Sequence, residues 1–61
     1  MTTIDTITDG QIHELRDEAG TAGDIDMIDT CDWALNDRSD NYYDSRRECA
    51  RVIAEAEAQE D

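Results

Sequence analysis

The chain has 61 residues, of which 17 are Asp or Glu and five are Arg, and because Lys is absent its formal net charge is −12. This charge disfavours direct binding to nucleic acid or to anionic membranes, and it favours encounter with a basic protein surface. No apolar run approaches the ~20 residues that span a bilayer, and the N-terminus lacks the basic and apolar regions of a signal peptide, so we expect a cytoplasmic protein.

An N-terminal lead over residues 1–7 is expected to be extended or frayed, because β-branched residues occur there without a helical period. The first predicted helix then covers residues 9–22. Thr8 stands three residues before Gln11, which is the spacing of a capping box. Gly23 suits the left-handed residue that follows a helix. Apolar residues recur at helical steps and predict one buried stripe, namely Ile12, Leu15, Ala19 and Ala22.

The second predicted helix covers residues 24–36 and begins at Asp24, whose side chain can accept a hydrogen bond from the first turn. At 100° per residue, one face carries the apolar residues Met27, Ile28, Cys31, Ala34 and Leu35. The opposite face carries carboxylates and the single tryptophan, namely Asp26, Asp29, Trp33 and Asp37. We therefore expect the helix to pack by its first face and to expose its second.

The third predicted helix covers residues 40–58 and follows a polar turn, with Ser39 or Asp40 as its cap. Arg46 lies on its apolar line, where the methylenes of the side chain can cover the seam. Residues 59–61 are expected to form a frayed acidic tail. Short connections between three helices predict one all-α domain over residues 8–58, a small antiparallel three-helix bundle. The buried stripe of the third helix is Tyr42, Cys49, Val52, Ile53 and Ala56.

Side chains with catalytic or metal-binding potential are few, and none has the neighbours that such chemistry needs. Asp24, Asp26 and Asp29 suggest calcium binding, but the positions where an EF-hand loop has Gly and Glu hold Asp29 and Leu35. His13 is surrounded by acidic residues on the first helix, and we interpret it as a surface residue. We therefore expect a protein that is not an enzyme and that has no cofactor and no metal.

Cys31 and Cys49 lie on the predicted buried stripes of the second and third helices. Because the cytosol keeps thiols reduced, we interpret both as small core residues. A disulfide between them and the ligation of a metal are the alternatives.

The acidic residues are concentrated in the middle of the chain, where seven carboxylates and no basic residue lie between Arg16 and Arg38. Along a helix, Asp26, Asp29 and Asp37 would extend over roughly 16 Å of one face, and a DNA strand carries its charges a few Å apart. Carboxylates spaced in this way can occupy Arg and Lys sites intended for phosphates. The predicted partner-binding residues are Asp17, Glu18, Asp26, Asp29, Asp32, Trp33 and Asp37.

Trp33 is the residue that could fix a binding pose, since an exposed Trp among carboxylates is a typical interface anchor. The alternatives are that Trp33 folds over Tyr42 or Tyr43 to complete the core, or that it forms a dimer contact. The acidity has a second explanation, because proteins that work in concentrated salt also carry Asp-rich surfaces without Lys. The basic residues of the third helix are expected to pair with the acidic helices or to hold a homodimer together, and they are Arg46, Arg47 and Arg51.

Two segments, LRDEAGTAGDIDMIDTCDWAL and RRECARVIAEAEA, resemble very short acidic proteins of phages and mobile elements of proteobacteria. Among named groups of this size and charge, the chain resembles the anti-CRISPR inhibitors. Several of these are small acidic proteins that keep target DNA from the basic surfaces of a CRISPR effector. The resemblance implies a stoichiometric inhibitor of a multi-subunit type I effector in a bacterial host cell, and it assigns a role to no individual residue.

The expected function is therefore that of a non-catalytic inhibitor, which uses an acidic helical face as a DNA mimic and blocks a basic nucleic-acid-binding surface of a type I CRISPR effector. One alternative is a small regulatory or structural adaptor of a phage or plasmid that works as a helical dimer through Tyr42, Tyr43 and Trp33. Another is an acidic decoy of a different DNA-binding protein, such as a transcription factor or a restriction enzyme.

Overall fold

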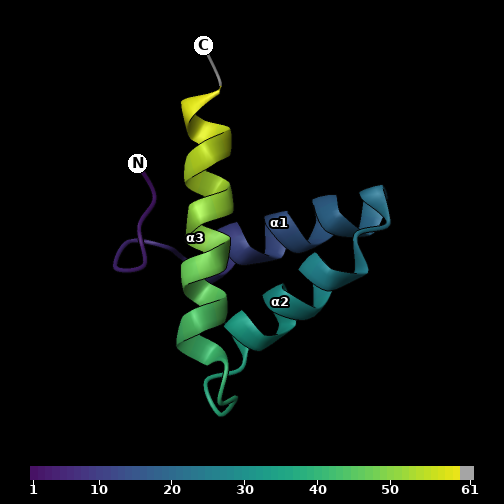
Figure 1. The fold of residues 1–61 in the computed structure, drawn as a ribbon, viewed down its shortest axis with the longest axis vertical. Helices are drawn as coiled ribbons and strands as arrows, with labels where there is room; N and C mark the ends of the chain where they lie inside the picture. The colour runs from purple at the N-terminus through teal and green to yellow at the C-terminus, as the bar shows by residue number, and fades with distance from the viewer. Residues whose placement is uncertain (60–61) are drawn as a thin grey trace.

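The computed structural model describes residues 1–59 and contains three helices, α1 (Asp9–Ala22), α2 (Ile25–Leu35) and α3 (Tyr42–Ala58). The predicted all-α three-helix bundle is therefore confirmed. Figure 1 shows that α1 and α2 run antiparallel beside each other and that α3 crosses both. None of the helices in the described part of the chain is long and apolar enough to cross a membrane.

The ends of α1 and the start of α2 have the caps that the sequence predicts. The Thr8 hydroxyl accepts a hydrogen bond from the Gln11 amide at 3.2 Å, and the Gln11 side chain accepts one from the Thr8 amide at 2.9 Å. Gly23 has a φ of 74°, which costs Gly little, and it lets the Asp24 amide donate to the Ala19 carbonyl at 2.8 Å. The Asp24 carboxylate then accepts from the Met27 amide at 3.2 Å, so α2 begins immediately.

The loop between α2 and α3 is longer than the sequence predicts. Asn41 precedes α3 and makes no side-chain capping bond, so neither Ser39 nor Asp40 caps the helix. The Ser39 hydroxyl instead accepts from the Asn41 amide at 3.1 Å, which holds a local turn and delays the helix to Tyr42. Because α2 ends at Leu35, Asp37 lies in this loop, which corrects its predicted place on the exposed face of the helix.

The N-terminal residues, which we expected to be extended or frayed, form a turn that is attached to α1 and α3. The Thr2 amide donates to a Glu57 carboxylate oxygen at 2.8 Å, and the Thr2 hydroxyl accepts from the Gln11 side chain at 3.1 Å. Ile7 is buried in the core. These bonds join the first residues of the chain to α1 and to the last turns of α3. The predicted frayed tail lies, apart from Gln59, outside the described residues.

The core is small because the molecule is thin, with principal extents of 37 × 27 × 16 Å. All five apolar residues predicted on the inner face of α2 are buried or half-buried. Two predicted core residues, Ala22 and Ala56, are exposed, because each lies near a helix end that the other helices do not cover. The buried apolar residues are Ile7, Ile12, Ala19, Cys31, Ala34, Cys49 and Ala50.

The two cysteines are fully buried free thiols at the centre of the core, in agreement with their interpretation as small core residues. Their sulfur atoms, from α2 and α3, are 3.9 Å apart. Burial raises the pKa of the Cys49 thiol to about 12 and also raises the pKa of Cys31. Both side chains therefore remain neutral and contribute packing between α2 and α3.

Arg46 connects α3 to the other elements through its guanidinium. Its ion pair with Asp9 of α1 agrees with the predicted pairing to the acidic helices, whereas Arg47 and Arg51 pair with acids of α3 itself. The Nη1 of Arg46 donates to the Ala34 carbonyl at 3.1 Å and to the Asp9 carboxylate at 2.9 Å, and its Nη2 donates to the Ile7 carbonyl at 3.1 Å. The side chain is only 13% exposed. One charged group thus holds the N-terminal turn, α1, α2 and α3 together.

Candidate functional site

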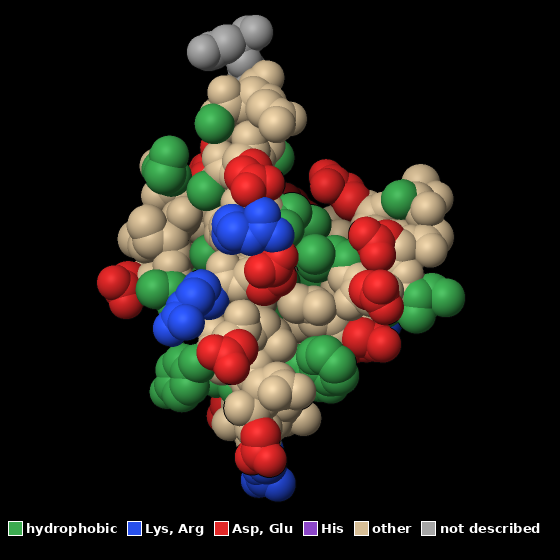
Figure 2. Space-filling view, viewed as in Figure 1, with side chains coloured by type: hydrophobic (Ala, Val, Ile, Leu, Met, Phe, Trp, Pro, Cys, Tyr) green, Lys and Arg blue, Asp and Glu red, His purple; other side chains and the backbone are tan. Residues whose placement is uncertain are grey.

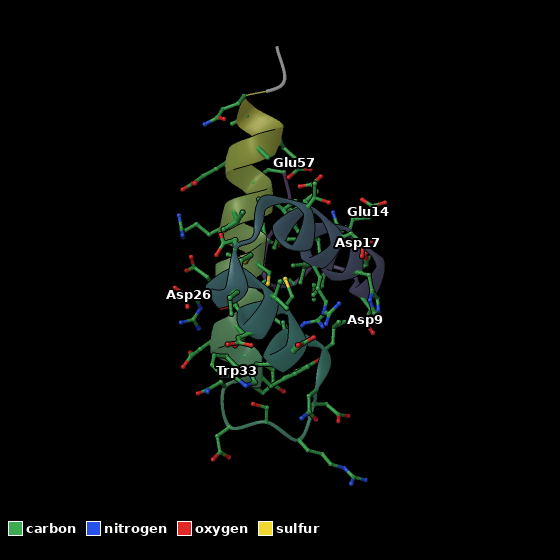
Figure 3. The ribbon with its side chains drawn as sticks, turned by 90° about the vertical axis from the view of Figure 1, so that its right-hand side faces the viewer. Asp9, Glu14, Asp17, Asp26, Trp33 and Glu57 are labelled. Carbon is green, nitrogen blue, oxygen red and sulfur yellow. The ribbon has the colours of Figure 1, made fainter. Side chains whose placement is uncertain are left out.

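The outward side of α2 carries the strongest candidate surface, which we call the α2 face and define as Asp26, Asp29 and Trp33. These residues are spaced by three and four positions, so they lie on one side of the helix over about 10 Å. All three are exposed, and Trp33 retains 44% of its accessible surface. Figure 3 shows Asp26 near the start of α2 and Trp33 near its end. The structure therefore brings together three of the seven predicted partner-binding residues.

The charge of the α2 face is not compensated by the chain itself. Within residues 1–59, neither Asp26 nor Asp29 forms an ion pair, whereas four of the five arginines pair with other carboxylates. Acidic side chains gather on the α1 and α2 side of the surface in Figure 2, while acidic and basic side chains alternate along α3. The α2 face is thus a place where an outside cation would meet a full negative charge.

Asp32, another predicted partner-binding residue, is engaged within the molecule. Its carboxylate accepts a hydrogen bond from Nε of Arg16 on α1 at 2.7 Å, and this contact raises the pKa of the Arg16 guanidinium. Asp32 therefore joins α1 to α2 and contributes much less negative potential than Asp26 or Asp29. The sequence could not show this, because the two partners are 16 positions apart.

The remaining predicted site residues are dispersed. Figure 3 shows Asp17 on the opposite side of the molecule from Asp26, together with Glu14. Glu18 lines a groove between α1 and α3. Asp37 lies in the loop after α2. A flat partner surface that covers the α2 face therefore does not also reach Asp17.

The surroundings of Trp33 include α3 residues that sequence reasoning missed. Trp33 lines a shallow pocket between α2 and α3 with Thr30, Asn41, Asp44, Ser45 and Glu48. Asp44 is 3.9 Å from the Arg47 guanidinium, and Glu48 accepts from Arg51, which lowers the pKa of the Glu48 carboxyl. The spacing of three residues between each acid and its arginine is readable from the sequence, but the proximity of both acids to Trp33 depends on how α3 crosses α2.

Among the described residues, Trp33 forms no aromatic pair with Tyr42 or Tyr43. The two tyrosine rings instead contact each other edge to face, with centroids 5.1 Å apart, and the Arg46 guanidinium lies 5.3 Å from the Tyr42 ring centre. Trp33 packs on the first turns of α3 by one side and is open to solvent on the other. A half-exposed Trp beside unpaired carboxylates is suited to non-covalent binding of a cationic surface.

Within residues 1–59, no three His, Cys, Asp or Glu side chains gather closely enough to hold a metal ion. His13 is exposed on α1. Comparison of the chain with protein families, with curated proteins and with solved structures gives no match. Its function must therefore be inferred from the surface itself.

Proposed function

We propose that this protein is a non-catalytic inhibitor that places the α2 face against a basic nucleic-acid-binding surface of another protein. The observation that carries the proposal is the uncompensated pair Asp26 and Asp29 beside the half-exposed Trp33. Local folding does not explain such a face, because neighbouring like charges destabilise a helix by a few tenths of a kcal/mol per pair. Contact with a cationic partner would relieve that repulsion.

The physical basis of the inhibition is competition for arginine and lysine side chains. Asp26 and Asp29 are separated by a rise of about 4.5 Å along α2, and a DNA strand presents phosphates at a similar spacing of a few Å. Trp33 would bury apolar surface at the centre of the contact, while the carboxylates would meet basic groups around it. Nucleic acid could then no longer occupy the same groups.

A type I CRISPR effector is the target that we propose, on the resemblance of the chain to anti-CRISPR inhibitors. CRISPR effectors hold nucleic acid in positively charged channels, so an acidic plug has an evident place to bind. The inhibitor would act at one copy per site, and it would prevent binding of the target DNA duplex without altering the effector covalently.

The test compares two double variants with the same change in net charge. Asp26→Lys/Asp29→Lys alters the α2 face, and Asp5→Lys/Asp40→Lys alters two other exposed positions. Asp32 is left unchanged, because a lysine there would face Arg16. The readout is the concentration of each protein that prevents a purified type I effector complex from shifting a target DNA duplex in a native gel.

We expect the α2 variant to need at least about tenfold more protein for half inhibition and the control to need less than about threefold more. Equal effects of the two variants would show that net charge alone matters and would refute the α2 face. Raising the salt concentration should weaken inhibition by the unmodified protein. The alternative explanation of the acidity, adaptation to concentrated salt, requires that the chain folds only at high salt, and circular dichroism at low salt tests this.

A second candidate function, a helical dimer that serves as an adaptor, is favoured by one observation. Tyr43 is 73% exposed at the start of α3, close in the chain to the half-buried Tyr42. Tyr43 therefore presents an apolar ring at the start of α3 that a second copy could cover. Light scattering distinguishes the two candidates, because a stable dimer that buries Trp33 would leave no anchor for a basic partner.

A further inference from the structure

A groove with an apolar floor and an acidic border lies between α1 and α3, and we call it the α1–α3 groove. Its floor is formed by Leu15 of α1 and by Val52, Ile53 and Ala56 of α3, and its volume is about 210 Å³. Carboxylates border it from both helices, with Glu14 and Glu18 on α1 and Glu57 on α3. Figure 3 shows Glu14 of α1 and Glu57 of α3 on the same side of the molecule.

The floor is open because α3 continues beyond the point where it crosses α1 (Figure 1). Leu15 and Ile53 pack against the core on one side and are only half-buried, so their other side faces the groove. The Ala56 side chain is too small to fill the groove. The floor is therefore continuous with the core, and it offers room for an aliphatic side chain from outside.

The charges at the border indicate the sign of the occupant. Glu14 and Glu18 are one helical turn apart, so they repel each other, and within residues 1–59 neither forms an ion pair. Glu57 borders the other side and already accepts the Thr2 amide. A second copy of the chain, with a net charge of −12, would be repelled, as would nucleic acid. A cationic protein segment complements the border.

We infer that the α1–α3 groove is a docking site for a basic amphipathic helix of the partner protein. One aliphatic side chain of that helix would lie on the floor, and Lys or Arg residues one turn away would meet Glu14 and Glu18 on one side and Glu57 on the other. This inference rests on the proposed function for the basic character of the partner. It adds a second contact, which recognises the partner by shape as well as by charge.

The test uses two synthetic peptides of equal length and charge, one with Leu and Lys in a helical amphipathic pattern and one with every Leu replaced by Ala. Each is titrated into the ¹⁵N-labelled protein, and the amide shifts are followed by NMR. We expect the Leu/Lys peptide to shift amides of Leu15, Val52 and Ile53 and to bind at least about fivefold more tightly than the Ala/Lys peptide.

Matched variants separate the groove from the overall field of the protein. Ala56→Lys places a cation in the groove, and Ala58→Lys makes the same charge change at another exposed position of α3 that does not line the groove. We expect Ala56→Lys to weaken binding of the Leu/Lys peptide at least about tenfold and Ala58→Lys less than about threefold. Lys suits a helix, so both variants should keep the helical circular dichroism of the unmodified protein.

A second pair of variants keeps the groove open and changes only charge, with Glu14→Gln/Glu18→Gln compared against Asp5→Asn/Asp40→Asn. The groove variant should bind the Leu/Lys peptide more weakly than the control. The inference is overturned if, in either comparison, the groove variant and its control bind the Leu/Lys peptide with equal affinity. It is also overturned if the two peptides bind the unmodified protein equally or if neither peptide binds.

The outcomes also separate the groove from the α2 face. Amide shifts confined to Asp26, Asp29 and Trp33 would refute the groove and leave the proposed function in place. Shifts in the groove, with an α2 variant that still inhibits the effector fully, would support the groove and refute the role of the α2 face.

Discussion

Replacement of Arg46 by Ala is expected to destabilise the fold more than any other single loss of charge, because this side chain bonds to three separate elements. It would leave the carbonyls of Ile7 and Ala34 without their donor and would remove the ion pair to Asp9. The guanidinium is mostly buried, whereas Asp9 is 72% exposed, so the two carbonyl bonds matter more than the ion pair.

The magnitude follows from the cost of unsatisfied polar groups. A buried carbonyl that loses its partner costs about 1–3 kcal/mol, and water that enters at the vacated position offsets part of this cost, so we expect Arg46→Ala to lower the free energy of unfolding by about 3 kcal/mol. A domain of this length has a total of about 3–9 kcal/mol. The variant should therefore retain a free energy of unfolding of about 0–6 kcal/mol, with a Tm lowered by roughly 12–24 °C.

The assay is urea unfolding followed by circular dichroism, with Arg47→Ala as the neighbouring control. Arg47 is 73% exposed and lies 3.9 Å from Asp44, so its loss should cost less than about 0.5 kcal/mol. Arg46→Lys keeps the charge and the aliphatic stem but cannot reach both carbonyls and Asp9, and it should fall between the two. If Arg46→Ala and Arg47→Ala had similar unfolding midpoints, the bracing role of Arg46 would be wrong.

Three further predictions concern the α2 face, the N-terminal turn and the core. Trp33→Ala should lower the free energy of unfolding by only about 1 kcal/mol, because the ring is half-exposed, yet weaken binding of the basic partner at least about tenfold. A large drop in the urea midpoint would instead make Trp33 a core residue. The hydrogen bond from the Thr2 amide lowers the pKa of the Glu57 carboxyl. This contact should therefore be present above the ordinary carboxyl pKa and be lost as the pH falls through the lowered value. The NMR shift of the Thr2 amide, titrated against pH, measures this loss. Burial raises the pKa of the Cys31 thiol and raises that of Cys49 to about 12, so the folded state favours neutral thiols and its stability should decline as the pH rises above about 9. A thiol reagent at pH 8 should react with the cysteines only after urea is added. Rapid reaction without urea would contradict the buried pair.

The helix ends that the sequence predicts well are those governed by neighbouring residues. Thr8 with Gln11, Gly23 and Asp24 each act on backbone groups no more than four or five positions away, so their roles can be recognised from spacing alone. The start of α3 is predicted wrongly, although it too depends on neighbouring residues. Ser39 can either cap a helix or bond the amide two residues later, and spacing does not decide between these.

The features that the sequence could not predict depend on how α3 crosses the α1 and α2 pair. Periodicity correctly places Asp26, Asp29 and Trp33 on one exposed face, because this needs only the geometry of one helix. The bond between Arg16 and Asp32, the carbonyl partners of Arg46 and the α1–α3 groove each require contacts between helices. The charge of individual residues and their pairing within one helix are therefore readable from the sequence, but the pairing of charges between helices is not.

The bond between Thr2 and Glu57 means that the two ends of the described chain meet, and this makes the fold a candidate for circular permutation. A short flexible linker could join the ends, and new termini could be opened in the exposed part of the loop over residues 36–41. The permuted chain would begin with α3, continue through the linker to α1 and finish with α2. Its folding rate, compared with that of the original order, would show whether α3 must dock last.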